Sequence, residues 1–119
     1  MKRSPTQFLN DILRGIEQIN VFVGTMTYDE FVNDLKTGRA VTQTLEIIGE
    51  AAKNLPAKLR NHYPTVPWAD MSGLRDKIAH FYFGIDYKIV WNVVKEKLPE
   101  IKPLIDNIIK ELKGGQLFE

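Results

Sequence analysis

The stretch LRDKIAHFYFG, residues 74–84, brings together three side chains suited to chemistry on a phosphate ester: Arg75, His80 and Tyr82. A guanidinium can bind a phosphate through two parallel hydrogen bonds and stabilise the charge that develops on it. An imidazole with a pKa near neutrality can take a proton from a ribose 2′-hydroxyl or give one to the leaving oxygen. Since the substrate then supplies the nucleophile, no metal ion is required. These residue types are therefore compatible with RNA cleavage.

A straight helix would not place these residues on one side. Arg75 and Tyr82 would point within about 20° of each other, whereas His80 would lie about 140° from Arg75. Asp76, four residues before His80, would share its face and could orient the imidazole and raise its pKa. Arg75 and His80 could meet on one ligand if the helix ends near His80, if Arg75 uses its long reach, or if a second copy of the chain supplies the facing helix.

The same residues also have an ordinary structural interpretation. His80 could be a partly buried core histidine, and Tyr82 a core ring with its hydroxyl at the rim. Arg75 could be a surface ion-pair partner of Asp76 or Glu50. Residue types and spacing alone leave both interpretations open.

The sequence contains too few suitable residues for other catalytic or metal-binding arrangements. The chain has no cysteine, which excludes a disulfide, a thiolate zinc site and a cysteine nucleophile. His62 and His80 are preceded three residues earlier by Leu59 and Lys77, so the Glu-x-x-His pairs of a carboxylate-bridged metal site are missing. No glycine-rich phosphate loop of the P-loop or Rossmann kind is present. We expect neither a metal nor a cofactor.

Length and composition indicate a cytoplasmic globular protein. The 119 residues fit one domain, 1–119, and the formal net charge is +1. This balance argues against a broad basic surface for duplex nucleic acid, although a local basic cleft remains possible. The N-terminal segment is an amphipathic helix, not a signal peptide. No apolar run approaches the roughly 18 residues that a membrane span needs.

Apolar residues recur at spacings of three and four through most of the chain, which is typical of amphipathic helices. We expect a first helix after an N-cap at Ser4. A short second helix should begin with a capping box at Thr27 and stop before Gly38. A third helix is predicted over 39–54, and one helical turn near 57–61.

The fourth predicted helix carries the reactive side chains. It should run over about 71–82 and end at Gly84, a natural left-handed cap. Asp86 can cap a last long segment that ends at 114–115, with a break or kink near Pro99, because a proline lacks the donor and clashes with the preceding turn. No segment alternates strictly, so we predict no strand. The predicted class is all-α, an up-and-down bundle of four to five helices.

The surroundings of the reactive trio resemble a known family. Three stretches carry the likeness: TLEIIGEAAKNLP at 44–56, VPWADMSGLRDKIAHFYFGIDYKIVW at 66–91 and EKLPEIKPLI at 96–105. The second includes a Pro-Trp turn and the motif Arg-x4-His-x-Tyr. In this order the stretches are similar to the HepT-like toxins, a branch of the HEPN superfamily. The likeness covers nearly the whole chain.

The resemblance implies a HEPN-like homodimer in which two motifs line one cleft. It implies a metal-independent endoribonuclease, with Arg75 and His80 as the catalytic pair and Asp76 in support. It also implies the toxin of a type VII-like HEPN/MNT toxin–antitoxin pair. The antitoxin would be an MntA-like nucleotidyltransferase that attaches AMP to Tyr82, so that bulk and charge beside Arg75 silence the site.

Two other functions remain as alternatives. The chain could be a non-catalytic helical partner that binds a nucleotidyltransferase, although such a module has no need for both Arg75 and His80. A DNA-binding regulator would need a basic recognition helix, which the near-zero net charge disfavours. We therefore expect no specific DNA partner, and we expect no association with a membrane.

Some charged residues outside the motif could also contact RNA. Glu50 could reach Arg75 or a dimer face, or be a solvated carboxylate on a helix surface. Lys77 and Arg60 could touch the RNA backbone, with a surface role as the ordinary explanation. His62 lies in a proline-rich linker and is expected to be exposed.

Overall fold

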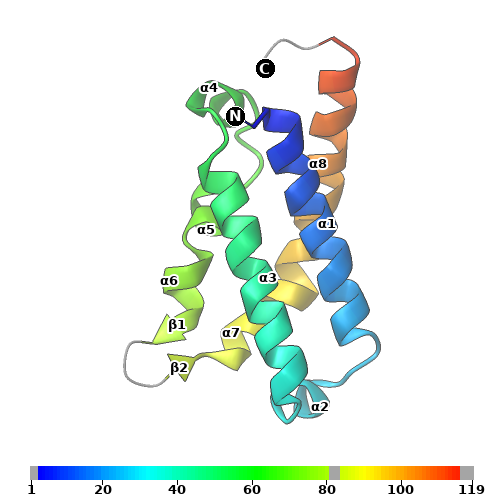
Figure 1. Ribbon diagram of the computed structural model, residues 1–119, viewed down its shortest axis with the longest axis vertical. Helices are drawn as coiled ribbons and strands as arrows, with labels where there is room; N and C mark the ends of the chain where they lie inside the picture. Colours follow the sequence, from blue (N-terminus) through cyan, green and yellow to red (C-terminus); the bar gives the residue numbers. More distant parts are fainter. Residues whose placement is uncertain (1–2, 81–83, 116–119) are drawn as a thin grey trace.

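Helices form most of the computed structural model, which describes residues 3–80 and 84–115 (Figure 1). The all-α class expected from the sequence is confirmed. The described residues form more helices than the four or five expected, and two short strands that were not expected. The elements in chain order are α1 Pro5–Val23, α2 Tyr28–Val32, α3 Leu35–Lys53, α4 Ala57–His62, α5 Trp68–Ser72, α6 Leu74–Ile78, β1 Ala79–His80, β2 Gly84–Ile85, α7 Tyr87–Asn92, a π-helical turn Val93–Lys97 and α8 Leu98–Lys113.

The long helices α1, α3 and α8 enclose the core (Figure 1). Their inner faces are apolar at helical spacing, and burying each such side chain stabilises the fold by roughly 1.5–3 kcal/mol. The short helices α4, α5 and α6 follow one another down one edge of the bundle (Figure 1). Fully buried side chains of the core include Leu9, Ile12, Ile16, Ile19, Leu45, Ile48, Leu59, Met71, Ile78, Leu98 and Ile105.

Side-chain caps set the starts of the helices. The capping boxes at Ser4 and Thr27 are both present, and the Asp86 carboxylate accepts hydrogen bonds at the start of α7, as expected. The second helix does stop before Gly38, at Val32, but the predicted start of the third helix at residue 39 is wrong. The Asp34 side chain accepts a hydrogen bond from the Thr37 backbone N–H at 3.0 Å, so α3 already begins at Leu35 and includes Gly38.

The predicted helix over 71–82 is also wrong. Gly73 separates α5 from α6, and α6 ends at Ile78. The chain then becomes extended, and Ala79 and His80 pair with Ile85 and Gly84 in an antiparallel ladder. Gly84 has the expected left-handed conformation, with φ of 78°, but it opens β2 and does not cap a helix.

The expected break near Pro99 takes the form of a π-helical turn. The Leu98 N–H bonds to the carbonyl of Val93, five residues earlier, at the end of this turn. Pro99 has no N–H to give to the carbonyl of Lys95, and its ring crowds that carbonyl. A wider turn relieves the crowding, because it moves the Lys95 carbonyl away from the ring. The α8 helix then continues through Pro103.

Gly49 permits the close approach of α3 to the α5–α6 junction. A Cβ atom added there would lie 2.7 Å from the Met71 carbonyl oxygen. We therefore expect Gly49→Ala to lower the free energy of unfolding by about 2 kcal/mol, because backbone must move to make room. Denaturant unfolding measures this change. Gly114→Ala is the matched control, since its added Cβ would meet nothing closer than 3.5 Å. Equal stability of both variants with wild type would contradict a tight contact.

Candidate active site

The α6 helix is anchored by two buried side chains and presents three charged ones. Leu74 and Ile78 are four residues apart and lie in the core. Arg75, Asp76 and Lys77 between them are exposed. The helix is therefore held on the bundle by its apolar face, while the motif arginine faces outwards.

Arg75 and Asp76 lie in a surface pocket of about 470 Å³ between α3 and α6. In the part of the chain that the structure describes, the Arg75 guanidinium forms no ion pair and no side-chain hydrogen bond, although carboxylates line the same pocket. It is thus free to bind an anion. No metal-binding group of three or more His, Cys, Asp or Glu side chains occurs within residues 3–80 and 84–115. The lining residues are Gln43, Glu46, Ile47, Gly49, Glu50, Lys53, Ser72, Arg75 and Asp76.

The structure places Glu50 in the pocket of Arg75, one of the two positions expected for it. It also adds Glu46 and Lys53, which sequence reasoning missed. Both follow from the α3 pattern, because Glu46, Glu50 and Lys53 are spaced by four and three residues on one exposed face. Lys77 instead lines a neighbouring cavity of about 250 Å³ between α6 and α8.

The end of α6 changes the expected relation between Asp76 and His80. They do not share one helix face, because the helix ends two residues before His80. The end of the helix meets one of the conditions under which Arg75 and His80 could approach one ligand. The His80 backbone pairs with Gly84. The His80 side chain and Tyr82 lie outside the described residues.

The loop that leads into α5 is tied down by Tyr63 and Trp68. Trp68 is buried, and its indole N–H donates to the Tyr63 carbonyl oxygen at 3.0 Å. The Tyr63 hydroxyl donates to Glu111 Oε2 on α8 at 2.5 Å. His62, just before this loop, is exposed as expected. These bonds connect the start of the α5–α6 segment to the C-terminal part of α8.

The Tyr63–Glu111 bond makes stability depend on pH. Burial and the nearby Glu111 carboxylate raise the pKa of Tyr63 to about 12, from an ordinary value of 10.0. We expect Tyr63→Phe to cost about 1 kcal/mol of stability at pH 7. The phenol must stay protonated to donate, so this contribution is complete below pH 10 and is lost as pH rises from 10 to 12. Denaturant unfolding of both proteins at pH 7 and above pH 11 checks this: a difference that persists at high pH would contradict it.

Among the helices that the structure describes, none is both long and apolar enough to cross a membrane. The fold and the site define an all-α protein whose motif arginine lies exposed in a surface pocket. The family model described as ribonuclease HepT-like matches residues 12–108, and the chain belongs to this family.

The names of three proteins similar in sequence agree with this assignment. The chain is 49% identical to "Putative RNase MJ0127" of Methanocaldococcus jannaschii, over 95% of this chain and 93% of that one. It is 42% identical to "Probable ribonuclease HepT" of Thermococcus cleftensis, over 92% of this chain and 100% of that one. It is 37% identical to "Putative RNase TTE0752" of Caldanaerobacter subterraneus, over 93% of this chain and 99% of that one. No solved structure matches significantly.

Proposed function

We propose that this protein is a metal-independent endoribonuclease with Arg75 and His80 as its catalytic pair. Membership of the ribonuclease HepT-like family supports RNA as the substrate. The observation that carries the assignment of the site is the exposed guanidinium of Arg75, which has no partner among the described residues and lies beside the segment that ends at His80. A cation held on a fixed helix without an internal partner is suited to bind the scissile phosphate.

In the proposed reaction, His80 accepts the proton of the ribose 2′-hydroxyl. The 2′-oxygen attacks phosphorus and the bond to the 5′-oxygen breaks, which leaves a 2′,3′-cyclic phosphate and a 5′-hydroxyl end. The leaving 5′-oxygen takes a proton from water, and Arg75 stabilises the charge on the phosphorane-like transition state. Asp76, in the pocket of Arg75, is assigned a supporting role in the site.

The charge of the Arg75 pocket supports a site completed by two copies of the chain. In one chain the carboxylates of the pocket outnumber its cations three to two. This charge disfavours the binding of a further RNA phosphate beside the one at Arg75. The exposed face of α3 beside it has heptad-like spacing and includes Ile47, which is 50% exposed. In an antiparallel dimer of this face, Arg39 of one copy would lie against Glu50 of the other. The residues of this face are Arg39, Gln43, Glu46, Ile47, Glu50 and Lys53.

Such a pairing would neutralise carboxylates that now surround Arg75 and leave both copies of Arg75 free for RNA. It would bring two motifs to one cleft, which is the arrangement that a lone helix cannot provide. We therefore include a homodimer in the proposed function.

The proposed biological role is that of a toxin in a toxin–antitoxin pair, acting on RNA in the cytoplasm. Its partner would be an MntA-like nucleotidyltransferase that transfers AMP to Tyr82. The added phosphate is an anion close to the residue meant for the RNA phosphate, and the nucleoside adds bulk. Both effects oppose RNA binding.

RNA cleavage in a chelator tests the proposed function. Purified protein is incubated with total RNA and excess EDTA, and the products are separated by size. We expect discrete fragments that increase with time. Intact RNA under these conditions, together with cleavage once Mg²⁺ or Mn²⁺ is added, would contradict the metal-independent mechanism. Intact RNA under both conditions would favour the non-catalytic binding partner.

A further inference from the structure

A second arginine without a partner among residues 3–80 and 84–115 lies outside the proposed catalytic pocket. Arg60, near the end of α4, is partly buried, and its Nε atom is buried without a hydrogen-bond partner. Among the described residues its guanidinium forms no ion pair. A buried donor left unsatisfied costs roughly 1–3 kcal/mol, so such a group calls for an explanation.

Arg60 lines an open pocket of about 500 Å³ between α4 and α5. Its walls are mostly flat and apolar, with two prolines and an indole, and Asn61 adds an amide. Asp70 also lines the pocket but makes no ion pair with Arg60. The volume falls within the range of small-ligand sites, about 300–1,000 Å³. The lining residues are Ala57, Arg60, Asn61, Pro64, Val66, Pro67, Trp68, Ala69 and Asp70.

The chemistry of this pocket suits one nucleotide. A guanidinium binds a phosphate by hydrogen bonds and charge, and flat apolar walls accept the face of a base. Trp68 is only 7% exposed and its indole N–H is already used by the Tyr63 carbonyl, so Trp68 offers a small apolar surface and no donor. Arg60 is then the cation that would define the site, and Asn61 can hydrogen-bond a sugar or base edge.

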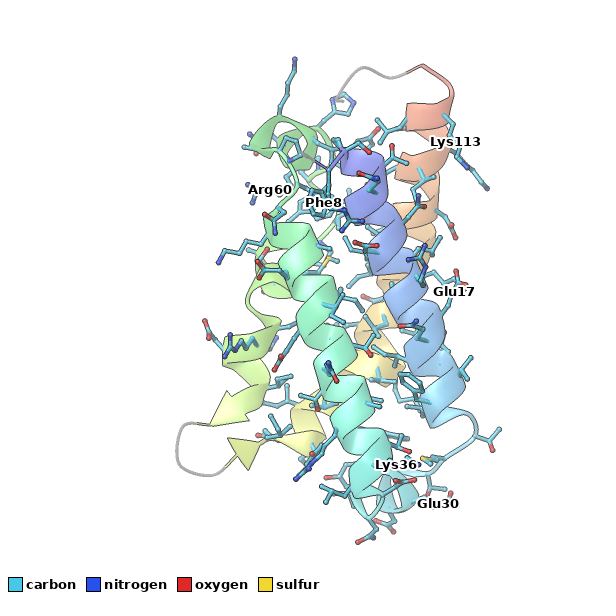
Figure 2. The ribbon with its side chains drawn as sticks, in the orientation of Figure 1. Phe8, Glu17, Glu30, Lys36, Arg60 and Lys113 are labelled. Atoms are coloured by element: carbon cyan, nitrogen blue, oxygen red, sulfur yellow. The ribbon has the colours of Figure 1, made fainter. Side chains whose placement is uncertain are left out.

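The position of the pocket relates it to Arg75. Figure 2 shows Arg60 beside α4, on the edge along which α4, α5 and α6 follow one another in Figure 1. The α5 helix contributes residues to both pockets, Ala69 and Asp70 to one and Ser72 to the other. A single strand that follows this edge would pass both arginines.

We infer that Arg60 and the pocket around it bind one nucleotide of the RNA strand, away from the bond that is cleaved. This inference rests on the proposed function, because it takes the scissile phosphate to lie at Arg75. Arg60 is a substrate-binding residue here. It holds a flanking phosphate and keeps the strand in register with the catalytic pair.

The test measures binding without turnover. A fluorescent single-stranded RNA is titrated with full-length protein carrying His80→Ala, and the anisotropy is followed at several salt concentrations. Adding Arg60→Ala should weaken binding about tenfold. It should also reduce the slope of log K against log salt by about 0.7, the value for one phosphate contact on a single strand. Arg14→Ala, which removes an arginine with a 68% exposed side chain on α1, should leave affinity and slope unchanged.

A second variant and a titration with AMP distinguish the possible outcomes. Arg60→Gln keeps most of the side chain and should reproduce the loss if the charge matters and packing does not. AMP is titrated as a free nucleotide, and we expect it to bind at least a hundredfold more weakly than the RNA. Unchanged RNA binding by both Arg60 variants would overturn the inference. Tight AMP binding that depends on Arg60, with RNA binding unchanged, would overturn the assignment to an RNA strand. A lack of RNA cleavage by the wild-type protein would contradict the proposed function alone. The anisotropy measurement of RNA binding does not depend on catalysis.

Discussion

Replacing Arg75 or His80 with alanine should lower the single-turnover rate of RNA cleavage by at least a hundredfold. Loss of a general acid or base costs about 10²–10⁴ in rate, and loss of a group that stabilises transition-state charge costs about 10²–10³. Arg75 is exposed and unpaired, so its removal leaves no buried charge behind and should not unfold the protein. Cleavage of a labelled RNA with enzyme in excess, with a thermal melt of each variant, measures both effects.

Lys77→Ala is the matched control for Arg75→Ala. Lys77 lies on the same short helix and is also exposed, but it lines the neighbouring cavity. It should keep cleavage within about threefold of wild type, the scale expected for a peripheral surface charge. Arg75→Lys keeps the charge but loses the planar fork, so it should recover only part of the rate. Full activity of Arg75→Ala would remove this residue from the site.

Mixing the two inactive variants examines the two-copy arrangement. If Arg75 of one copy acts with His80 of the other, a dimer of Arg75→Ala with His80→Ala contains one complete site. Mixed samples should then regain part of the activity that neither variant shows alone. A mixture that forms dimers by sedimentation but stays inactive would place both residues of a site in one chain.

Tyr82→Phe should make the protein resistant to silencing by its cognate nucleotidyltransferase. Wild-type protein incubated with that enzyme and ATP should gain AMP and lose RNA cleavage. The phenylalanine variant has no hydroxyl to accept the adenylyl group, so its cleavage should continue at the starting rate. Intact-mass analysis and the cleavage assay on the same samples measure modification and silencing together.

Tyr28→Phe is the control for that variant. Tyr28 lies at the start of α2, outside the Arg-x4-His-x-Tyr motif, and packs edge-on against Trp91. It should still be modified and silenced like wild type. AMP that persists on Tyr82→Phe would exclude Tyr82 as the acceptor. Modification of wild type without any loss of cleavage would exclude AMP transfer as the off-switch.

Much of the helical fold is predictable because local chemistry decides it. Ser4, Thr27 and Asp86 cap helices with side chains that lie within three residues of the N–H groups they accept from. Pro99 likewise acts on the turn just before it, so a break near this residue could be expected. These features need no knowledge of what packs against them.

The features that sequence reasoning missed depend on tertiary contacts. Gly38 looks like a helix end, yet in α3 it makes room for the ring of Tyr87, whose Cε1 would lie 2.8 Å from an added Cβ. The hairpin at Ala79–His80 needs a pairing segment on the far side of residues 81–83. Helix propensity alone cannot show either contact. The prediction made from it therefore placed the end of the motif helix too late in the chain.

The candidate site is predictable in its residue types but not in its surroundings. The exposure of Arg75 follows from the apolar Leu74 and Ile78 on either side of it in the helix repeat. The carboxylates of α3 that share its pocket come from a segment about 25–30 residues earlier, and the packing of α3 against α5 and α6, close at Gly49 and Met71, brings them there. The spacing of these carboxylates on α3 can be read from the sequence, but the element that α3 packs against cannot.

The end groups of the RNA products test the central claim most directly. A labelled RNA, and the same RNA with one 2′-deoxynucleotide at the cleaved position, are incubated with wild-type protein in EDTA. We expect a 2′,3′-cyclic phosphate and a 5′-hydroxyl at the break, no cleavage at the deoxy position, and no cleavage of either RNA by His80→Ala. Products with 5′-phosphate ends, or cleavage at the deoxy position, would contradict attack by the 2′-hydroxyl and with it the roles assigned to Arg75 and His80.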